Sequence, residues 1–261
     1  MKFLIGSKES LGVGTDADWS WSDFAEWISS AVERSPETMA EFHAWPKDRQ
    51  SAAKQADWIS GGKFREGKRQ LAALEYRTMF TLDIDECSPE ALEAIEAGQT
   101  RFSDLTHCGH TTRSSTPTKP RLRLYFPTDA ELDGETYRSA ALALCRIVEL
   151  LPGVVVDTAA STDPARLLYQ PTLCADAPHV SINSHGSTPD TEWLLATGKE
   201  LAPKQAQEGP LQARRDVPVP NGDQDLDHRG VEAMRAAGAV IVPSPRRRGE
   251  LTTNCPWHDD Q

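Results

Sequence analysis

Two carboxylates at the end of an apolar run are the residues of this chain best suited to chemistry. Residues 79–85 read MFTLDID, which places Asp83 and Asp85 one residue apart. In an extended strand alternate side chains share a face, so both acids point the same way. Two like charges about 7 Å apart repel each other unless a cation lies between them, and a divalent metal is the usual cation. The pair is a candidate metal site, although a strand that runs into an acidic loop at Glu86 gives the same pattern.

A third acid, Asp157, follows the apolar run Val154–Val156. Three carboxylates can hold two cations about 3.5–4 Å apart, the arrangement used for in-line phosphoryl or nucleotidyl displacement. By itself Asp157 is more typical of a cap at the end of a strand. Downstream, residues 163–166 (Asp-Pro-Ala-Arg) lead into a short apolar strand at 167–169, and Arg166 adds a cation near the same sheet edge.

Two basic strips flank the acid pair in the sequence. The first strip comprises Lys63, Arg65, Lys68 and Arg69, and the second comprises Arg113, Lys119, Arg121 and Arg123. The formal net charge of -11 argues against coating of DNA by the whole surface, but local strips matter more than the total charge. Each strip could be an ordinary solvated face. Around a metal-type acid pair, the strips are also consistent with a channel for phosphates.

The spacing of apolar residues predicts the elements that position these groups. Strands are expected at 78–83, 121–126 and Val154–Val156. Because basic and apolar residues alternate in the second of these strands, its two arginines should share one side. Helices are expected at 22–35, 88–98 and 135–151, the first capped by Ser22 and the second begun by Ser88 and Pro89.

Length and composition limit the class of protein. A chain of 261 residues with 38% hydrophobic content and seven tryptophans can form one large domain, or one domain with a small appendage. No run approaches the roughly 18 apolar residues needed to span a bilayer, so we expect a soluble, cytoplasmic protein without a membrane partner. Five cysteines without paired spacing favour reduced thiols over a disulfide framework.

The composition changes after about residue 200. We expect a catalytic domain over residues 1–200, a linker over 201–227 and a small C-terminal segment over 228–261. In the last segment a short helix is expected at 228–237 and a strand at 240–242. Cys255 and His258 supply at most half of a zinc site. The segment is a candidate for the start of a further domain.

Three sequence blocks together resemble the archaeo-eukaryotic primase superfamily, and most closely the primase-polymerases of phages, prophages and plasmids. The blocks are the strand that ends in Asp83 and Asp85, the Ser/Thr-rich turn 111–117 running into Lys-Pro-Arg-Leu-Arg at 119–123, and Asp157 followed by the 163–166 motif. The resemblance covers residues 63–171. The three blocks are more specific together than any one of them alone.

The resemblance implies an α+β (mixed α/β) fold, with a sheet like that of an RNA-recognition motif and a second small α/β unit. It implies synthesis of primers from NTPs or dNTPs on single-stranded DNA, and their extension, during phage, prophage or plasmid replication in a bacterial host. Asp83, Asp85 and Asp157 would hold two Mg²⁺ or Mn²⁺ ions, and the first basic strip would contact the template. In such proteins a helicase commonly follows, in the same chain or in a partner.

The second block departs from the family pattern. It usually ends on a histidine that contacts the incoming triphosphate, but this position holds Arg113, and His107 and His110 lie upstream. Because arginine binds phosphate bidentately, we expect Arg113 to take this role, with His110 and Ser115 as weaker candidates. Further cations for the triphosphate or the template are Lys119, Arg121, Arg123 and Arg166. His107, Cys108 and His110 are interpreted as a polar loop, or as a zinc knuckle without a fourth ligand.

Two rival functions remain open on the sequence. A catalytically inactive module that binds single-stranded or origin DNA could keep this fold; the intact acids argue against it, and the missing motif histidine argues for it. A transferase that binds a nucleotide-sugar through Mn²⁺ at a DxD motif needs neither Asp157 nor two basic strips. The sequence also leaves open whether chains are initiated or only extended.

Overall fold

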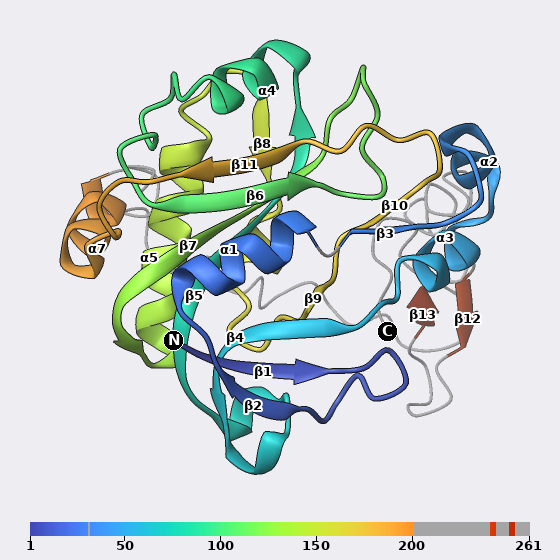
Figure 1. Ribbon diagram of the computed structural model, residues 1–261. Helices are drawn as coiled ribbons and strands as arrows, with labels where there is room; N and C mark the ends of the chain where they lie inside the picture. The colour runs from blue at the N-terminus through green and yellow to red at the C-terminus, as the bar shows by residue number, and fades with distance from the viewer. Residues whose placement is uncertain (31, 201–240, 244–250, 254–261) are drawn as a thin grey trace, which may run out of the picture. The chain divides into compact units, whose positions relative to one another are not determined.

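The computed structural model describes residues 1–30, 32–200, 241–243 and 251–253 (Figure 1). The chain divides into two compact units, Met1–Pro203 and Lys204–Gln261. In the second unit β12 (Ile241–Pro243) pairs antiparallel with β13 (Leu251–Thr253), so the strand expected at 240–242 is found at β12. The expected linker at 201–227, the helix at 228–237, Cys255 and His258 lie outside the described residues.

A nine-stranded sheet forms the centre of the first unit, in the order β11-β6-β7-β5-β4-β1-β2, with β8 added beside β5 and β9 beside β4. Every pairing within it is antiparallel. A small parallel pair, β3 with β10, lies apart from this sheet. The strands are β1 Lys2–Gly6, β2 Thr15–Asp18, β3 Glu33–Arg34, β4 Trp58–Phe64, β5 Leu74–Cys87, β6 His107–Thr111, β7 Leu122–Leu132, β8 Val154–Val156, β9 Leu168–Tyr169, β10 Thr172–Leu173 and β11 Ser181–Ser184.

Helices cover both faces of the sheet (Figure 1). Helix α5 packs on β5, β7 and β8, and α7 packs on α5, whereas α1 contacts β6 and β11. The α+β class expected from the sequence is confirmed. The sequence also implied a sheet and a second small α/β unit; in the structure a single sheet, joined by the pairing of β4 with β5, runs through both. None of the described helices is long and apolar enough to cross a bilayer. The helices are α1 Trp21–Ser30, α2 Met39–Ala44, α3 Lys47–Ala53, α4 Pro89–Glu96, α5 Gly134–Val148, α6 Thr158–Ser161 and α7 Thr191–Glu200, with 3₁₀ turns η1 Arg65–Gly67 and η2 Leu71–Ala73.

Strand β5 separates two cores by simple alternation. Phe80, Leu82 and Ile84 belong to the core beneath α5, whereas Met79 belongs to the core beneath α1. Residues two apart on a strand share a face. Asp83 therefore lies on the α1 face, beyond the end of the apolar cluster.

The sheet forks between β4 and β5. These strands pair only near their connecting turn, where Gly62 lies opposite Arg77. Farther along, the same edge of β4 pairs with β9, and the same edge of β5 pairs with β8. The strands therefore diverge, and the chain between β8 and β9 fills the gap. Gly62 has a φ of 148°, and a Cβ there would lie 2.4 Å from the Tyr76 carbonyl oxygen, so the fork requires glycine.

Most predicted elements near the acids are present. Strands expected at 78–83 and 121–126 are the longer β5 and β7, and the helices expected at 88–98 and 135–151 are α4 and α5. The helix expected at 22–35 is shorter, because it begins at Trp21 and ends at Ser30. Its cap is Ser20 and not Ser22, since Ser20 Oγ accepts from Asp23 N at 3.1 Å. The polar loop expected for His107, Cys108 and His110 is wrong: these residues belong to the buried strand β6.

Candidate functional site

A row of polar residues crosses the sheet on the α1 face. The register pairs Asp83 of β5 with Arg123 of β7, and Arg123 with His110 of β6. On the other edge of β5, Asp157 N donates to Asp83 O at 2.8 Å. Residues directly opposite on antiparallel strands point to the same face, so Asp83, Arg123 and His110 lie side by side. At Asp83 the edge of β5 is no longer paired with β4, and just beyond it the same edge pairs with β8.

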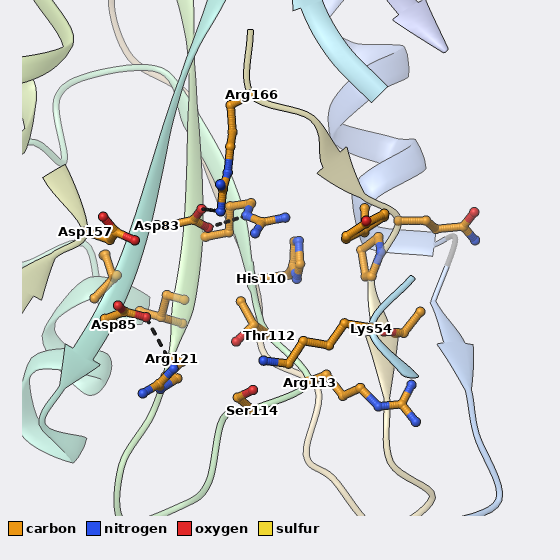
Figure 2. A pocket seen from close by; sticks show the side chains of 17 residues that line it. Lys54, Asp83, Asp85, His110, Thr112, Arg113, Ser114, Arg121, Asp157 and Arg166 are labelled. Atoms are coloured by element: carbon orange, nitrogen blue, oxygen red, sulfur yellow. Dashed lines mark hydrogen bonds and ion pairs between the residues drawn. The ribbon is translucent and has the colours of Figure 1, made fainter. Parts of the chain in front are cut away.

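This row lines a cavity of about 210 Å³, which we call the carboxylate pocket (Figure 2). The structure brings together the three acids that the sequence singled out. In Figure 2 they lie on one side of the pocket, with Lys54 and Arg113 on the other. The charged lining consists of Asp83, Asp85, Asp157, Lys54, Arg113, Arg121, Arg123 and Arg166.

Asp83 is the buried acid of the pocket, with 9% of its surface exposed. Its carboxylate forms ion pairs with Arg123 Nε and, at 3.6 Å, with Arg166 Nη2. Burial raises the pKa of Asp83, but the two guanidinium groups outweigh burial and hold the pKa below its usual value. Asp83 is therefore ionised at neutral pH. Likewise the pKa of Arg123 is raised by Asp83 in spite of burial.

Asp85 is the exposed acid of the pocket, with 52% of its side chain accessible. Its Oδ1 lies 3.3 Å from Arg121 Nη1. A register shift between Ile84 and Glu86 opposite β8 marks a bulge at Asp85, and bulges re-aim side chains at the end of a strand. Asp85 thus lines the same pocket as Asp83 from a backbone that has begun to turn.

Asp157 combines the two roles considered for it in the sequence. Its Oδ1 accepts from Ala160 N at 3.0 Å and so caps α6, while the side chain also lines the pocket. The position of Asp157 is fixed by β8 and by its backbone bond to Asp83. The acid is therefore part of the pocket and a helix cap at once.

His110 lines the pocket but has no ring nitrogen to spare. Nδ1 lies 2.9 Å from Thr111 O, and Nε2 lies 3.0 Å from Tyr125 Oη. Burial lowers the pKa of His110 to about 3, so the ring is neutral. A neutral ring with both nitrogens engaged is poorly suited to a phosphate, so His110 serves the pocket mainly by packing.

Arg113 is held by protein carboxylate and hydroxyl groups, contrary to the direct phosphate role expected for it. It is 6% exposed, forms an ion pair with Glu37, and donates from Nη2 to Ser35 Oγ at 2.6 Å. Figure 2 shows its guanidinium directed away from the acids. Ser115 is also structural, because its Oγ accepts from Arg121 N at 3.2 Å.

The first basic strip does not line the pocket. Its cations are held within and around the β4–β5 turn. Lys63 opposes Tyr76, which is seven residues before Asp83 and therefore about 23 Å away along β5. Lys119, of the second strip, also lies outside the lining and pairs with Glu86 at 2.9 Å. The partners in the turn are Glu75 for Lys63, Ala72 O for Arg65, Glu66 for Lys68, and Leu11 O and Ala165 O for Arg69.

The roles of two basic residues were not predicted from the sequence. Lys54 follows α3 and lines the pocket, although it is 29 residues before Asp83 in the chain. Arg77 is fully buried at the fork, where its Nη1 donates to Ser60 Oγ at 2.7 Å and to Pro164 O at 3.2 Å. Ser60 Oγ donates in turn to Arg166 O at 3.0 Å. Arg77 therefore supports the loop that presents Arg166, a role that no local sequence pattern could indicate.

The donor chemistry of the pocket suits a hard divalent cation, because carboxylate oxygens are the ligands that Mg²⁺ and Mn²⁺ prefer. As arranged, however, no three His, Cys, Asp or Glu side chains of the described residues lie close enough together to enclose an ion. Two of the acids are paired with arginines instead. The residues fit a metal by type. For the zinc knuckle considered at His107, Cys108 and His110, the described residues likewise offer no set of ligands.

Comparisons with known proteins bear on the whole first unit. No curated protein matches the sequence significantly. The AEP domain of the cyanophage S-2L primase-polymerase is a solved structure with a TM-score of 0.38 and 12% identity, covering 75% of this chain and 87% of that one. The profile of the VapE N-terminal domain matches residues 8–201, which is most of the chain, and the protein therefore belongs to the VapE N-terminal domain family.

Proposed function

We propose that this chain is a template-dependent nucleotidyltransferase that makes primers on single-stranded DNA and extends them. The observation that carries the proposal is that three acids and five cations line one pocket at the fork of the sheet. The resemblance of the sequence blocks to primase-polymerases supports the same reading. The proposed setting is phage, prophage or plasmid replication in the cytoplasm of a bacterial host, with a helicase in the same or a partner chain.

The balance of charge in the pocket favours a polyanionic substrate. The whole chain carries -11, yet cations outnumber acids in the pocket lining. Arg121, Arg123 and Arg166 already neutralise Asp83 and Asp85, so the acids do not repel a triphosphate as free carboxylates would. Guanidinium groups bind phosphate bidentately, and in a half-buried pocket such bonds are strong. We assign triphosphate binding to Arg121 and Arg166.

Asp83, Asp85 and Asp157 are the residues that would hold Mg²⁺ or Mn²⁺. When bound, such ions lower the pKa of an attacking 3′-hydroxyl and neutralise a leaving pyrophosphate. The chain itself supplies the arginines that orient the phosphates, and Arg123 keeps the Asp83 carboxylate ionised and fixed on the sheet. Asp83 is thus a carboxylate at neutral pH, the form in which it can bind a cation.

The test is incorporation of labelled nucleotide on unprimed and on primed single-stranded DNA with Mg²⁺ or Mn²⁺. Asp85→Ala is the variant of choice, since Asp85 is exposed and we expect its loss to leave the fold intact. Asp16→Ala, at an exposed acid on β2, is the matched control. Short products from unprimed DNA that vanish only in Asp85→Ala are expected. Extension of primed DNA alone would reduce the function to that of a polymerase.

One observation favours a second candidate, a catalytically inactive module that binds single-stranded or origin DNA. The arginine pairs of Asp83 and Asp85 leave no three acids of the described residues converged on one point. A protein that bound DNA phosphates without metal would use these arginines in the same way. Binding of single-stranded DNA by wild type, with no incorporation on either template, would establish that candidate and overturn the first.

A further inference from the structure

Lys54 enters the carboxylate pocket from a part of the chain that has no share in the sequence blocks. It follows α3, and Figure 2 shows its side chain extending across the pocket toward Arg121. Among the described residues Lys54 has no carboxylate within ion-pair distance, and its strongest charged neighbour is Arg121, a cation. Burial, followed by Arg121 and Lys47, lowers the pKa of Lys54.

Holding Lys54 beside Arg121 has an electrostatic cost. Asp83 is already paired with two arginines and Asp85 with Arg121, and Asp85 attracts Lys54 less strongly than Arg121 and Lys47 repel it. A half-buried ammonium beside a guanidinium group is repelled and partly desolvated. An anion with several oxygen atoms between the two cations would offset both costs through charge-assisted hydrogen bonds. The pocket is therefore prepared for an anion at the Lys54 side.

We propose that Lys54 binds a phosphate oxygen of the nucleoside triphosphate, opposite Arg121, and that the Arg113–Glu37 ion pair positions the segment that carries it. This inference rests on the proposed function for the identity of the ligand. In this proposal Arg113 acts on the triphosphate indirectly, because it helps to place Lys54.

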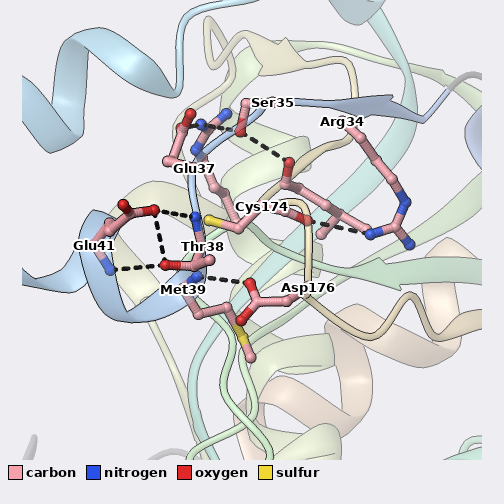
Figure 3. Close-up of polar contacts among 10 residues, drawn as sticks. Arg34, Ser35, Glu37, Thr38, Met39, Glu41, Cys174 and Asp176 are labelled. Carbon is pink, nitrogen blue, oxygen red and sulfur yellow. Dashed lines mark hydrogen bonds and ion pairs between the residues drawn. The ribbon is translucent and has the colours of Figure 1, made fainter.

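The segment between β3 and Lys54, which we call the lysine arm (residues 33–54), is tied down at its start. Arg113 holds Glu37 and Ser35 on one side. On the other side Arg34 Nη1 donates to Cys174 O at 3.1 Å, and Asp176 Oδ1 accepts from Met39 N at 2.7 Å. Figure 3 shows these contacts gathered around the start of α2. The start of the arm is therefore fastened to the loops beside the pocket.

The rest of the arm transmits this placement to Lys54. A reciprocal cap joins Thr38 and Glu41 at the start of α2, as Figure 3 shows. Gln50 Nε2 donates to Trp45 O at 2.8 Å and so fixes α3 against the end of α2. Lys54 follows directly on α3, with its backbone N–H bonded to Ser51 O and Ala52 O. A disturbance at Glu37 is thus expected to shift Lys54 while leaving the sheet residues in place.

The first experiment measures binding of inorganic tripolyphosphate by titration calorimetry, without metal and at low salt. Lys54→Gln should weaken binding about tenfold, the loss of one charge-assisted bond. Lys54→Arg should stay within about threefold of wild type, since it keeps the charge. Lys8→Gln, at an exposed lysine outside the pocket lining, is the matched control and should bind as wild type does. Wild-type affinity in Lys54→Gln would overturn the assignment.

The second experiment tests the positioning role of Arg113 and Glu37 with a double-mutant cycle. Glu37→Gln should weaken tripolyphosphate binding by about threefold in wild type and have no effect in Lys54→Gln, because both act through one side chain. Equal effects in the two backgrounds would overturn that role. Primer synthesis is measured in parallel. Binding that depends on Lys54 without nucleotide incorporation would contradict the proposed function alone, whereas incorporation with no effect of Lys54 on binding would contradict only this inference.

Discussion

The two basic strips that flank the acids are alike in sequence and unlike in space. The strip at 63–69 lies at the β4–β5 turn, where each cation is held by a side chain or carbonyl of the turn or of the loops packed on it. In the strip at 113–123, Arg121 and Arg123 pair with the catalytic candidates Asp85 and Asp83. The cations of the first strip stabilise a turn, whereas three of the four cations of the second strip line the carboxylate pocket.

The difference is a consequence of topology and not of composition. Arg121 and Arg123 belong to or adjoin β7, which runs directly beside the end of β5 that bears the acids. The earlier strip adjoins the opposite end of the same long strand. A flanking position in the sequence therefore says little until the strand order is known. Substitution of charged residues should therefore have different effects in the two regions.

The largest contrast is expected in stability. Asp83→Ala leaves Arg123, whose side chain is 15% exposed, without its main partner, and we expect it to lower the free energy of unfolding by about 3 kcal/mol. Glu66→Gln breaks the exposed pair with Lys68 and should cost about 1 kcal/mol or less. Urea unfolding of both variants makes the comparison. Equal losses of unfolding free energy in the two variants would contradict this prediction, because the Asp83–Arg123 pair would then contribute no more to stability than the exposed Glu66–Lys68 pair.

A second contrast concerns pH. The pKa of His110 falls from 6.5 to about 3 on folding, so the unfolded chain binds the proton first. This contribution to stability is complete above pH 6.5 and is lost as the pH falls toward 3; between pH 7 and 4.5 we expect a loss of about 3 kcal/mol. Asp83, whose pKa is also lowered, adds a loss of the same sign at lower pH.

Removing the titrating group should flatten this dependence. His110→Gln is expected to show a smaller loss of unfolding free energy between pH 7 and 4.5, measured by urea titration at each pH. His43→Gln, at an exposed position of α2, is the control and should leave the wild-type dependence unchanged. A pH dependence that is the same in His110→Gln and in wild type would mean that His110 titrates normally in the folded protein.

A third contrast concerns nucleotide use. Arg121→Gln removes a charge-assisted phosphate contact and should raise the KM for nucleotide about tenfold, with a smaller effect on kcat. Lys68→Gln, in the turn, should leave KM within experimental error, because its ammonium pairs with Glu66 and lies outside the pocket. Steady-state incorporation on a primed template gives both constants. A rise in KM for Lys68→Gln would return the turn to the substrate path.

The smallest effect is expected in template binding. Binding of single-stranded DNA should weaken steeply with salt, since each phosphate contact contributes a slope of about 0.7. The sequence assigned the 63–69 strip to the template, and the turn contacts of Lys63 and Lys68 argue for a weaker role. Lys68→Gln should therefore change the slope by less than about 0.7. A change of one full contact or more would restore the original assignment.

Local patterns predicted the strands and helices around the acids well, because alternation in β5 and β7 and the cap at Ser88 are local signals. They could not predict Lys54 in the pocket or Arg77 beneath the loop of Arg166, since both depend on where the sheet forks. The ion pair that holds Arg113 could not be predicted for a similar reason. Its partner Glu37 is 76 residues away in the chain, and only the packing of the arm brings the two together.

The most direct measurement is a crystal structure of the protein with a non-hydrolysable nucleoside triphosphate and Mn²⁺, with the ion located by its anomalous scattering. We expect manganese bound by Asp83 and Asp85, with the phosphates between Arg121 and Lys54 and the Arg121–Asp85 ion pair broken. A triphosphate held at the 63–69 turn, or an ordered triphosphate in the pocket with no manganese at these carboxylates, would contradict the assignment of the pocket as a nucleotidyl-transfer site.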